Sequence, residues 1–274
     1  IIKICQKNNL ILIEDCAHSL GAEYNGKYCG SFGDISFFSF GKDKIISSVF
    51  GGAVVVNNVK LLEKIEKEYN ESPFPSSSWT FQQLLYPSLM EYIFLPLFRF
   101  RIGRKIWSAF FELNAFYLRS VTKEENQGIL PSFFGKKLPN ALAGLALNQL
   151  KKLERFNNHR REIAAVYFRE FKDIAVFKED FEKRNPVFMR FPLKSNKASL
   201  IISEARKFGL FLNDGWRETI VVPPKTIQEK MGYRKGECKL AEELTKEIVS
   251  LPTHIKVSVK DAEKIAWVIN SLAR

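Results

Sequence analysis

The sequence predicts an α/β fold in which short apolar strands alternate with helical segments. Apolar runs at residues 10–14, 35–40 and 52–56 read as strands, and the first ends in an acidic pair, as buried parallel strands often do. Helical periodicity follows over residues 59–69. Strands that alternate with helical connections are typical of a sheet built from crossover units.

Composition and charge narrow the class of protein. The 274 residues are 46% apolar and 26% charged, as in an ordinary globular protein. The net charge of +12 favours anionic partners, but nucleic-acid-binding motifs are absent, so we expect no nucleic acid partner. Four cysteines without C-x-x-C spacing and three histidines predict reduced thiols, a cytoplasmic location and no metal site. The chain opens at Ile1 in what reads as the tail of a helix, so we expect an N-terminal truncation.

Residues 72–137 differ in character from the strands before them. Pro73, Pro75 and a run of serines predict a loop, and the apolar stretch 81–98 that follows is interrupted by two prolines and a glutamate. This stretch is marginal in length for a transmembrane helix and is interrupted by polar and helix-breaking residues. Two interpretations remain: a helical hairpin packed in an oligomer interface, or peripheral membrane contact through residues 81–105, with the arginines toward lipid headgroups. We favour packing, because apolar helical stripes more often face a protein core.

The last part of the chain predicts a small α/β domain. A long helix over 140–171 leads into it, followed by a strand at 186–193, a helix at 198–208 and a short strand at 211–212. Two more helices are predicted at 238–251 and 261–272, the last begun by a capping box of Ser258 and Asp261. We therefore divide the chain into a large domain, 1–155, with an apolar helical insert at about 75–130, and a small C-terminal domain, 156–274.

Four polar residues follow the first two predicted strands. Asp15 and His18 follow the first strand. Ser39 lies at the end of the second strand, and Lys44 follows that strand. In α/β sheets, ligands bind outside the carboxyl ends of the strands, so these side chains could share one pocket. Each residue alone is explained equally well as a turn former or an ordinary polar side chain.

Seven segments carry a wider pattern. They are IEDCAHSLGA at 13–22, GSFGD at 30–34, SFGKDK at 39–44, GGAVV at 51–55, AGLALNQL at 143–150, AEEL at 241–244 and LPTH at 251–254. With these segments the chain resembles the DegT/StrS-type sugar aminotransferases, which are fold type I enzymes dependent on pyridoxal 5'-phosphate (PLP). The resemblance implies the C-terminal part of the large mixed-sheet domain together with a small α/β domain.

The resemblance also implies a role for each candidate residue. Asp15 would pair with the pyridinium nitrogen of PLP, and His18 would lie against the cofactor ring. Ser39 would donate a hydrogen bond to the phosphate. Lys44 would bond covalently to the cofactor and later move a proton on the amino donor.

The implied reaction transfers an amino group from an amino acid, with glutamate expected, to a keto-sugar. A nucleotide-linked sugar suits the basic chain, and the pathway would make cell-surface or secondary-metabolite amino-sugars. The family implies a homodimer. His254 is a candidate substrate contact, and a structural role in its turn is equally well supported.

The chain departs from the family pattern in two places. Val49-Phe50 stands where many members have Gly-Glu, and Gly135, Lys136 and Lys137 stand nearest to an asparagine and arginine supplied by the neighbouring subunit. We expect this fragment alone to bind PLP poorly. Two alternatives stay open: a non-catalytic scaffold or membrane-associated partner that retains the fold, and a PLP-dependent sugar dehydratase. Lys44 argues against the dehydratase, where a histidine typically replaces it.

Overall fold

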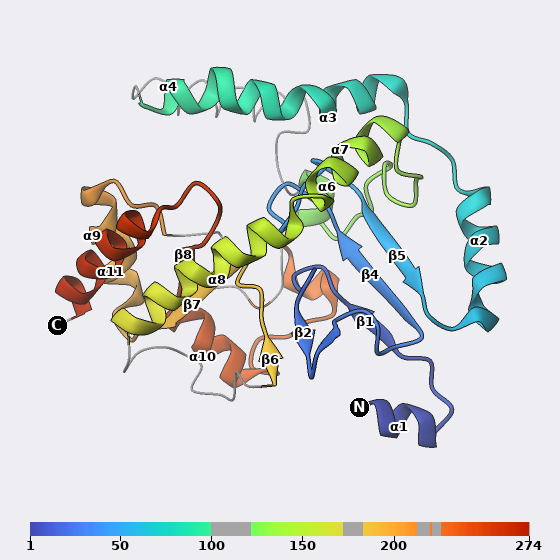
Figure 1. Cartoon of the computed structure of the whole chain (residues 1–274), viewed down its shortest axis with the longest axis horizontal. Helices are drawn as coiled ribbons and strands as arrows, with labels where there is room; N and C mark the ends of the chain where they lie inside the picture. Colours follow the sequence, from blue (N-terminus) through green and yellow to red (C-terminus); the bar gives the residue numbers. More distant parts are fainter. Residues whose placement is uncertain (100–121, 172–182, 213–219, 221–225, 274) are drawn as a thin grey trace. The chain divides into compact units, whose positions relative to one another are not determined.

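The computed structural model describes residues 1–99, 122–171, 183–212, 220 and 226–273 (Figure 1). The chain forms two compact units. Unit 1 comprises Ile1–Leu20, Lys27–Thr122 and Pro131–Leu153, and unit 2 comprises Gly21–Gly26, Lys123–Leu130 and Glu154–Arg274. Each unit has its own sheet and its own apolar cluster. The domain boundary at 155/156 stays a prediction.

A three-stranded mixed sheet organises unit 1. Strand β1 (Ile13–Asp15) runs parallel to β4 (Ile35–Ser39), which pairs antiparallel with β5 (Gly52–Val56), as the blue arrows of Figure 1 show. Strand β1 begins later than predicted, because the backbone N–H of Leu12 donates to the Asp34 carboxylate at 2.8 Å and is not available to a ladder. The short strands β2 (Glu23–Tyr24) and β3 (Lys27–Tyr28) occupy the connection to β4.

One face of this sheet is exposed. Ile13, Asp15, Phe37 and Val54 share that face, because residues alternate along each strand and Asp15 lies opposite Phe37, which lies opposite Val54. Ile13, Phe37 and Val54 are 57%, 38% and 55% exposed. Within the part of the chain that the structure describes, this apolar face is therefore uncovered.

Glu14, on the opposite face, holds the loop that precedes β4. Its carboxylate accepts hydrogen bonds from the backbone N–H groups of Gly30 at 2.9 Å, Phe32 at 2.7 Å and Gly33 at 2.7 Å. Gly30 has a φ of +96°, and a Cβ atom there would lie 2.6 Å from the ring of Phe38, so glycine is required. The GSFGD segment therefore folds around a single carboxylate.

The other elements described in unit 1 are helices. They are α1 (Ile2–Lys7), η1 (Val59–Leu61), α2 (Leu62–Glu71), α3 (Ser77–Leu89), η2 (Met90–Phe94), α4 (Leu95–Arg99) and α7 (Asn140–Leu150). The loop predicted at the serine run is wrong in part. Ser76 accepts a hydrogen bond from the Trp79 backbone N–H at 3.2 Å and caps α3, because a hydroxyl satisfies a backbone donor that the first turn leaves unpaired.

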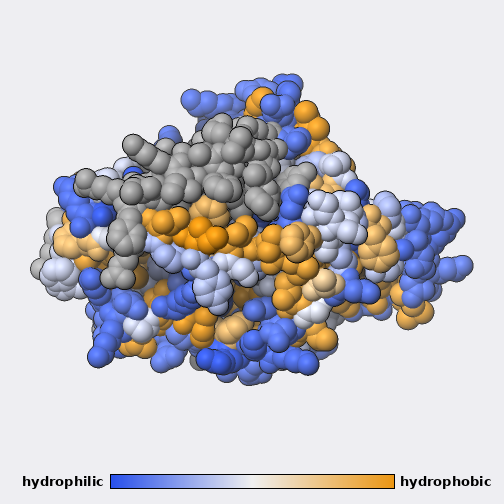
Figure 2. All heavy atoms as spheres, turned by 90° about the horizontal axis from the view of Figure 1, so that it is seen from above, coloured by the Kyte–Doolittle hydropathy of each residue, from blue (hydrophilic) through white to orange (hydrophobic). Residues whose placement is uncertain are grey.

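The segment α3–η2–α4 exposes apolar side chains. Phe81, Tyr92, Ile93 and Leu95 are all at least 46% exposed. Figure 2 looks onto the side of the chain where α3, η2 and α4 lie and shows hydrophobic residues there. Among the described residues, none of the helices is long and apolar enough to cross a membrane. Residues 100–121 of the predicted insert, and with them the end of the segment 81–105, lie outside the described part.

Unit 2 packs helices against a two-stranded sheet. Strand β7 (Arg190–Lys194) pairs antiparallel with β8 (Ile248–Pro252), and the side chains of Phe191, Leu193 and Leu251 are fully buried. The other described elements are α6 (Lys123–Asn126), α8 (Leu153–Glu170), β6 (Arg184–Asn185), α9 (Ala198–Ala205), η4 (Arg206–Phe208), η5 (Gln228–Met231), α10 (Lys239–Glu247) and α11 (Val259–Ala273). Strand β6 pairs with β2.

The structure corrects several predicted boundaries. The helix predicted over 238–251 ends at Glu247, because the next residues form β8 and bury Val249 and Leu251 on one face with the period of a strand. The helix predicted over 140–171 is two helices separated at Lys151-Lys152. The strand predicted at 186–193 starts at Arg190, and residues 211–212 are not a strand.

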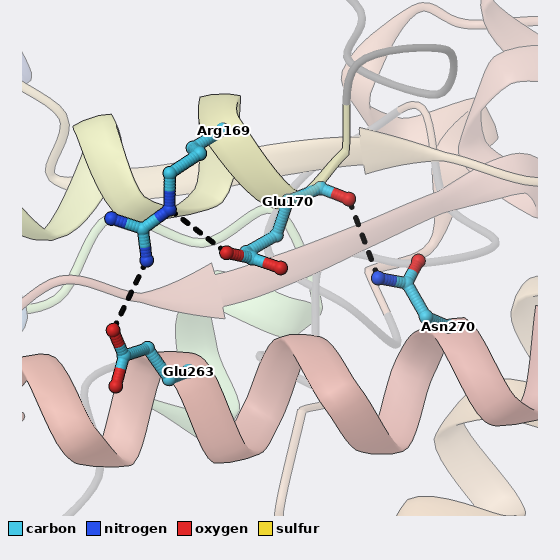
Figure 3. Close-up of polar contacts among 4 residues, drawn as sticks. All are labelled: Arg169, Glu170, Glu263 and Asn270. Carbon is cyan, nitrogen blue, oxygen red and sulfur yellow. Dashed lines mark hydrogen bonds and ion pairs between the residues drawn. The ribbon is translucent and has the colours of Figure 1, made fainter.

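Polar contacts join the end of α8 to α11 (Figure 3). Arg169 donates to the carboxylates of Glu170 at 2.9 Å and Glu263 at 3.1 Å, and Asn270 donates to the backbone oxygen of Glu170 at 3.3 Å. Because these groups are exposed, their contacts contribute little to the free energy of unfolding, and their main effect is to align the two helices.

The capping box predicted at the start of α11 is confirmed. The Ser258 backbone N–H donates to the Asp261 carboxylate at 2.9 Å, and the Asp261 N–H donates to the Ser258 hydroxyl at 3.1 Å. The hydrogen bonds from the Ser258 hydroxyl and backbone hold the pKa of Asp261 below its usual range.

Replacing Glu14 with glutamine should destabilise the protein by about 2 kcal/mol, because the amide has one acceptor oxygen for three partly buried backbone donors. Urea unfolding at neutral pH measures the change. The control is Glu63→Gln on the exposed face of α2, which should stay within about 0.5 kcal/mol of the wild type. Equal stabilities for the two variants would contradict the role given to Glu14.

Replacing Asp261 with asparagine should lower the midpoint of thermal unfolding at pH 7, and the deficit should shrink below about pH 4. A carboxyl whose pKa is lowered by folding contributes stability above its unfolded pKa, and loses it as the pH falls through the folded value. Unfolding scans of both proteins from pH 7 to pH 3 test this. A deficit that is constant across that range would rule out the charged cap.

Candidate functional site

The four predicted site residues all belong to unit 1. Asp15 is the last residue of β1, and Ser39 is the last residue of β4. Because the two strands are parallel, these residues lie at the same edge of the sheet. His18 and Lys44 follow in the loops that leave this edge.

The structure brings Lys44 and His18 into direct contact. The Lys44 Nζ atom lies 2.7 Å from His18 Nε2, so the ammonium donates to the imidazole when the ring proton is on Nδ1. Lys44 is half-buried, and the His18 side chain is exposed. Asp15 accepts a hydrogen bond from the Ala17 N–H at 3.0 Å, and the Ser39 hydroxyl accepts one from the Gly41 N–H at 3.4 Å.

The loop that carries Lys44 is anchored on both sides of it. The Lys44 N–H donates to the Gly41 oxygen at 3.2 Å and closes a tight turn. Ile45 and Ile46, the next two residues, are 4% and 1% exposed. The backbone of Lys44 is therefore fixed, while its side chain reaches His18.

Val49 occupies a strained position in the same loop. Its φ is +74°, in the left-handed region that glycine adopts readily and a β-branched residue rarely does. The side chain is buried, at 4% exposed. A glycine, which the pattern of the resembled family has here, would adopt this backbone without strain, and in this chain the burial of the isopropyl group offsets part of the strain.

Sequence reasoning missed two residues next to this loop. The Lys42 ammonium lies 4.3 Å from the centroid of the Tyr86 ring on α3, and burial lowers the pKa of Lys42 to about 8. Lys42, the first lysine in the Gly-Lys-Asp-Lys segment, is visible in the sequence. Its aromatic partner could not be identified, because Tyr86 is distant along the chain and occupies an unremarkable helical position.

The other predicted contacts have structural partners. His254 lies in unit 2, where its Nδ1 accepts a hydrogen bond from the Lys256 N–H at 3.3 Å. Burial is the main cause that lowers the pKa of His254, and the charge of Arg160 lowers it further. Its substrate role stays a prediction. Lys137 donates to the Asn70 oxygen at 2.9 Å.

The residues at this sheet edge fit a PLP cofactor chemically. Such a cofactor needs a primary amine for covalent attachment, and Lys44 supplies a half-buried one in contact with the His18 imidazole, which suits contact with the cofactor ring. The Asp15 carboxylate suits the pyridine nitrogen, and the Ser39 hydroxyl suits the phosphate.

Several curated proteins are similar to this chain. The UDP-4-amino-4,6-dideoxy-N-acetyl-beta-L-altrosamine transaminase of Campylobacter jejuni strain 81-176 is 28% identical over 275 residues, which are 96% of this chain and 58% of that protein. The GDP-perosamine synthase of Escherichia coli O157:H7 is 47% identical over 64 residues, 23% of this chain and 18% of that protein. The chain spans just under three-fifths of the length of the relatives that it matches from end to end.

Solved structures share the fold. PseC of Helicobacter pylori, an aminotransferase involved in the biosynthesis of pseudoaminic acid, has a TM-score of 0.65 at 22% identity, with 100% of this chain and 62% of that chain covered. A DegT DnrJ EryC1 StrS aminotransferase from Brucella abortus has a TM-score of 0.66 at 19% identity, with 99% and 59% covered. Spr1654 of Streptococcus pneumoniae in its PLP form has a TM-score of 0.63 at 18% identity, with 96% and 58% covered. The fold type I prediction is confirmed.

A family model matches residues 1–77 and 113–270, which is most of the chain. The unmatched stretch, 78–112, falls within the apolar insert predicted from the sequence. The resemblance seen in the sequence is confirmed, and the chain belongs to the DegT/DnrJ/EryC1/StrS aminotransferase family.

Proposed function

We propose that the protein containing this chain is a PLP-dependent aminotransferase that acts on a nucleotide-linked keto-sugar, with glutamate as the amino donor. The observation that carries the proposal is the contact of Lys44 with His18, 2.7 Å apart, beside the carboxyl ends of β1 and β4. Membership of an aminotransferase family supports the reaction class.

Four residues would hold the cofactor. Lys44 would attach to it covalently, Asp15 would pair with the pyridine nitrogen, His18 would contact the ring and Ser39 would bind the phosphate. When bound, PLP supplies an electron sink for the electrons of the broken bond. An exposed carboxylate at the end of a strand suits Asp15 to its role, because it can approach a ligand without rearrangement of the sheet.

Lys44 would have two roles in the reaction. Its amine is nucleophilic only when deprotonated, and the hydrogen bond to His18 Nε2 holds the nitrogen in a defined place. Once an amino donor has displaced Lys44, the free Nζ atom would take the proton from the α-carbon of the donor. The fixed backbone at Ile45 and Ile46 confines this movement to the lysine side chain.

The proposed substrate is consistent with charge and with the relatives. A net charge of +12 attracts an anion such as a nucleoside diphosphate sugar. The curated relatives include UDP-sugar and dTDP-sugar transaminases. We propose a homodimer as the working state, as the family pattern implies.

A non-catalytic scaffold is the second candidate. Phe50 stands where the family pattern has a polar residue, and its ring lies 5.1 Å from the rings of both Trp79 and Phe133. This apolar cluster next to the Lys44 loop is the observation that favours it.

Replacing Lys44 with alanine should abolish amino transfer and the visible absorption band of bound cofactor, because the covalent anchor of the cofactor is lost. The protein should stay folded, because the substitution removes little buried apolar surface. The measurement is the absorption spectrum of the full-length protein with PLP, before and after glutamate. Lys60→Ala, an exposed lysine in η1, is the control and should behave as the wild type. Unchanged turnover in Lys44→Ala would contradict the mechanism, and a wild type without any band would favour the scaffold.

Replacing Asp15 with asparagine should lower kcat by roughly 10²–10³-fold while PLP remains covalently attached, because the amide supplies no negative charge opposite the ring nitrogen. Steady-state kinetics and borohydride reduction followed by peptide mapping separate the two effects. Loss of attachment together with activity would show that Asp15 serves folding or binding instead.

A further inference from the structure

Helix α3 packs one of its faces against the loop that carries Lys44. Trp79, Gln83 and Tyr86 are spaced i, i+4 and i+7, so they lie on one side of the helix. Trp79 and Gln83 are buried, at 8% and 1% exposed. Apart from its first residue, the helix lies in the stretch 78–112 that the family model does not match. It is therefore an element outside the family pattern that touches the proposed site.

The first contact lies near the end of the loop. The ring of Phe50 meets the ring of Trp79 edge-on, with centroids 5.1 Å apart and an interplanar angle of 89°. Phe133 stacks on Trp79 at 5.7 Å, and Leu142 of α7 is buried in the same cluster. Edge-to-face aromatic pairs of this kind favour one orientation over others, so this end of the loop is held to α3.

The second contact lies at the turn that contains Lys44. The Lys42 Nζ atom is 4.3 Å from the centroid of the Tyr86 ring, within the range of a cation–π interaction. Burial raises the pKa of Tyr86, and so does the charge of Asp43. Lys42 and Asp43, the two central residues of the turn, thus both act on one ring of α3.

Fixing Lys42 also fixes Lys44. The two residues belong to one turn, closed by the hydrogen bond from the Lys44 N–H to the Gly41 oxygen at 3.2 Å. We propose that α3 is a positioning element for Lys44, and that it acts through the contact of the Tyr86 ring with the Lys42 ammonium. The inference rests on the proposed function, because that function gives Lys44 its role. Lys42 and Tyr86 are positioning residues and take no part in bond making.

Tyr86→Leu is the central variant, because it removes the ring and keeps an apolar side chain on α3. Tyr86→Phe keeps the ring and should rescue the contact. Tyr92→Leu is the matched control: Tyr92 lies in η2, directly after α3, and is 78% exposed. Lys42→Met removes the ammonium, and its combination with Tyr86→Leu should add little to either single change, since both remove one interaction.

Two measurements on the full-length protein test the proposal. With PLP, the rate of covalent attachment at Lys44 is followed by absorption, and the site is mapped after borohydride reduction. We expect Tyr86→Leu and Lys42→Met to slow attachment by roughly three- to tenfold, as the loss of a desolvated cation–π contact implies, and Tyr86→Phe and Tyr92→Leu to match the wild type.

Without cofactor, competitive acetylation across a range of pH reports on Lys42 itself, with the exposed Lys64 as internal reference. Its titration should move from about 8 in the wild type toward the ordinary 10.5 in Tyr86→Leu, because the smaller leucine leaves the amine less buried, and this effect outweighs the lost attraction between ring and ammonium. Tyr86, Asp43 and Lys44 are titratable neighbours of Lys42 within the described residues, and Tyr86→Phe, which lacks the phenol, controls for its charge.

The outcomes separate this inference from the proposed function. A wild type that never attaches PLP would overturn the proposed function, and the acetylation profile would still decide whether Tyr86 holds Lys42. An unchanged profile in Tyr86→Leu would overturn the inference, as would unchanged attachment in a protein that does bind PLP. Equal slowing in Tyr92→Leu, or failure of Tyr86→Phe to rescue, would also overturn it.

Discussion

The sheet edge of unit 1 depends on the carboxylate of Glu14. By accepting three backbone N–H groups it ties the segment 30–33 to β1, and that segment leads directly into β4. The parallel pairing of β1 with β4 follows, and with it the placement of Asp15 and Ser39 at one edge. Glu14, with its structural carboxylate, thus directly precedes Asp15, whose carboxylate is proposed to act on the cofactor. The two side chains face opposite sides of the sheet.

Much of this arrangement could be predicted from the sequence. The apolar runs located β4 and β5 closely, and polar residues directly after strands indicated a ligand site, because parallel strands end at one edge. The spacing of Ser258 and Asp261 predicted their capping box, since such a motif is completed within one turn. Features that depend on residues close together in the sequence could therefore be predicted.

Features that depend on distant partners could not be predicted. Residues 248–252 continue an apolar helical pattern, and they form a strand because β7 supplies the other half of the ladder. The contact of Lys42 with Tyr86 depends likewise on how α3, which is distant along the chain, folds back onto the loop. Val49 shows a third case: its left-handed backbone is imposed by the loop around it, against the preference of a valine.

The uncovered sheet face of unit 1 has a consequence for the colloidal behaviour of the chain. Ile13, Phe37 and Val54 present contiguous apolar surface on strands, a type of surface that adheres to other apolar surfaces when it meets water. The like charges of a strongly basic chain oppose such adhesion at low ionic strength, and salt screens them. Buffers of low ionic strength should therefore keep this polypeptide in solution, and concentrated salt should favour its aggregation.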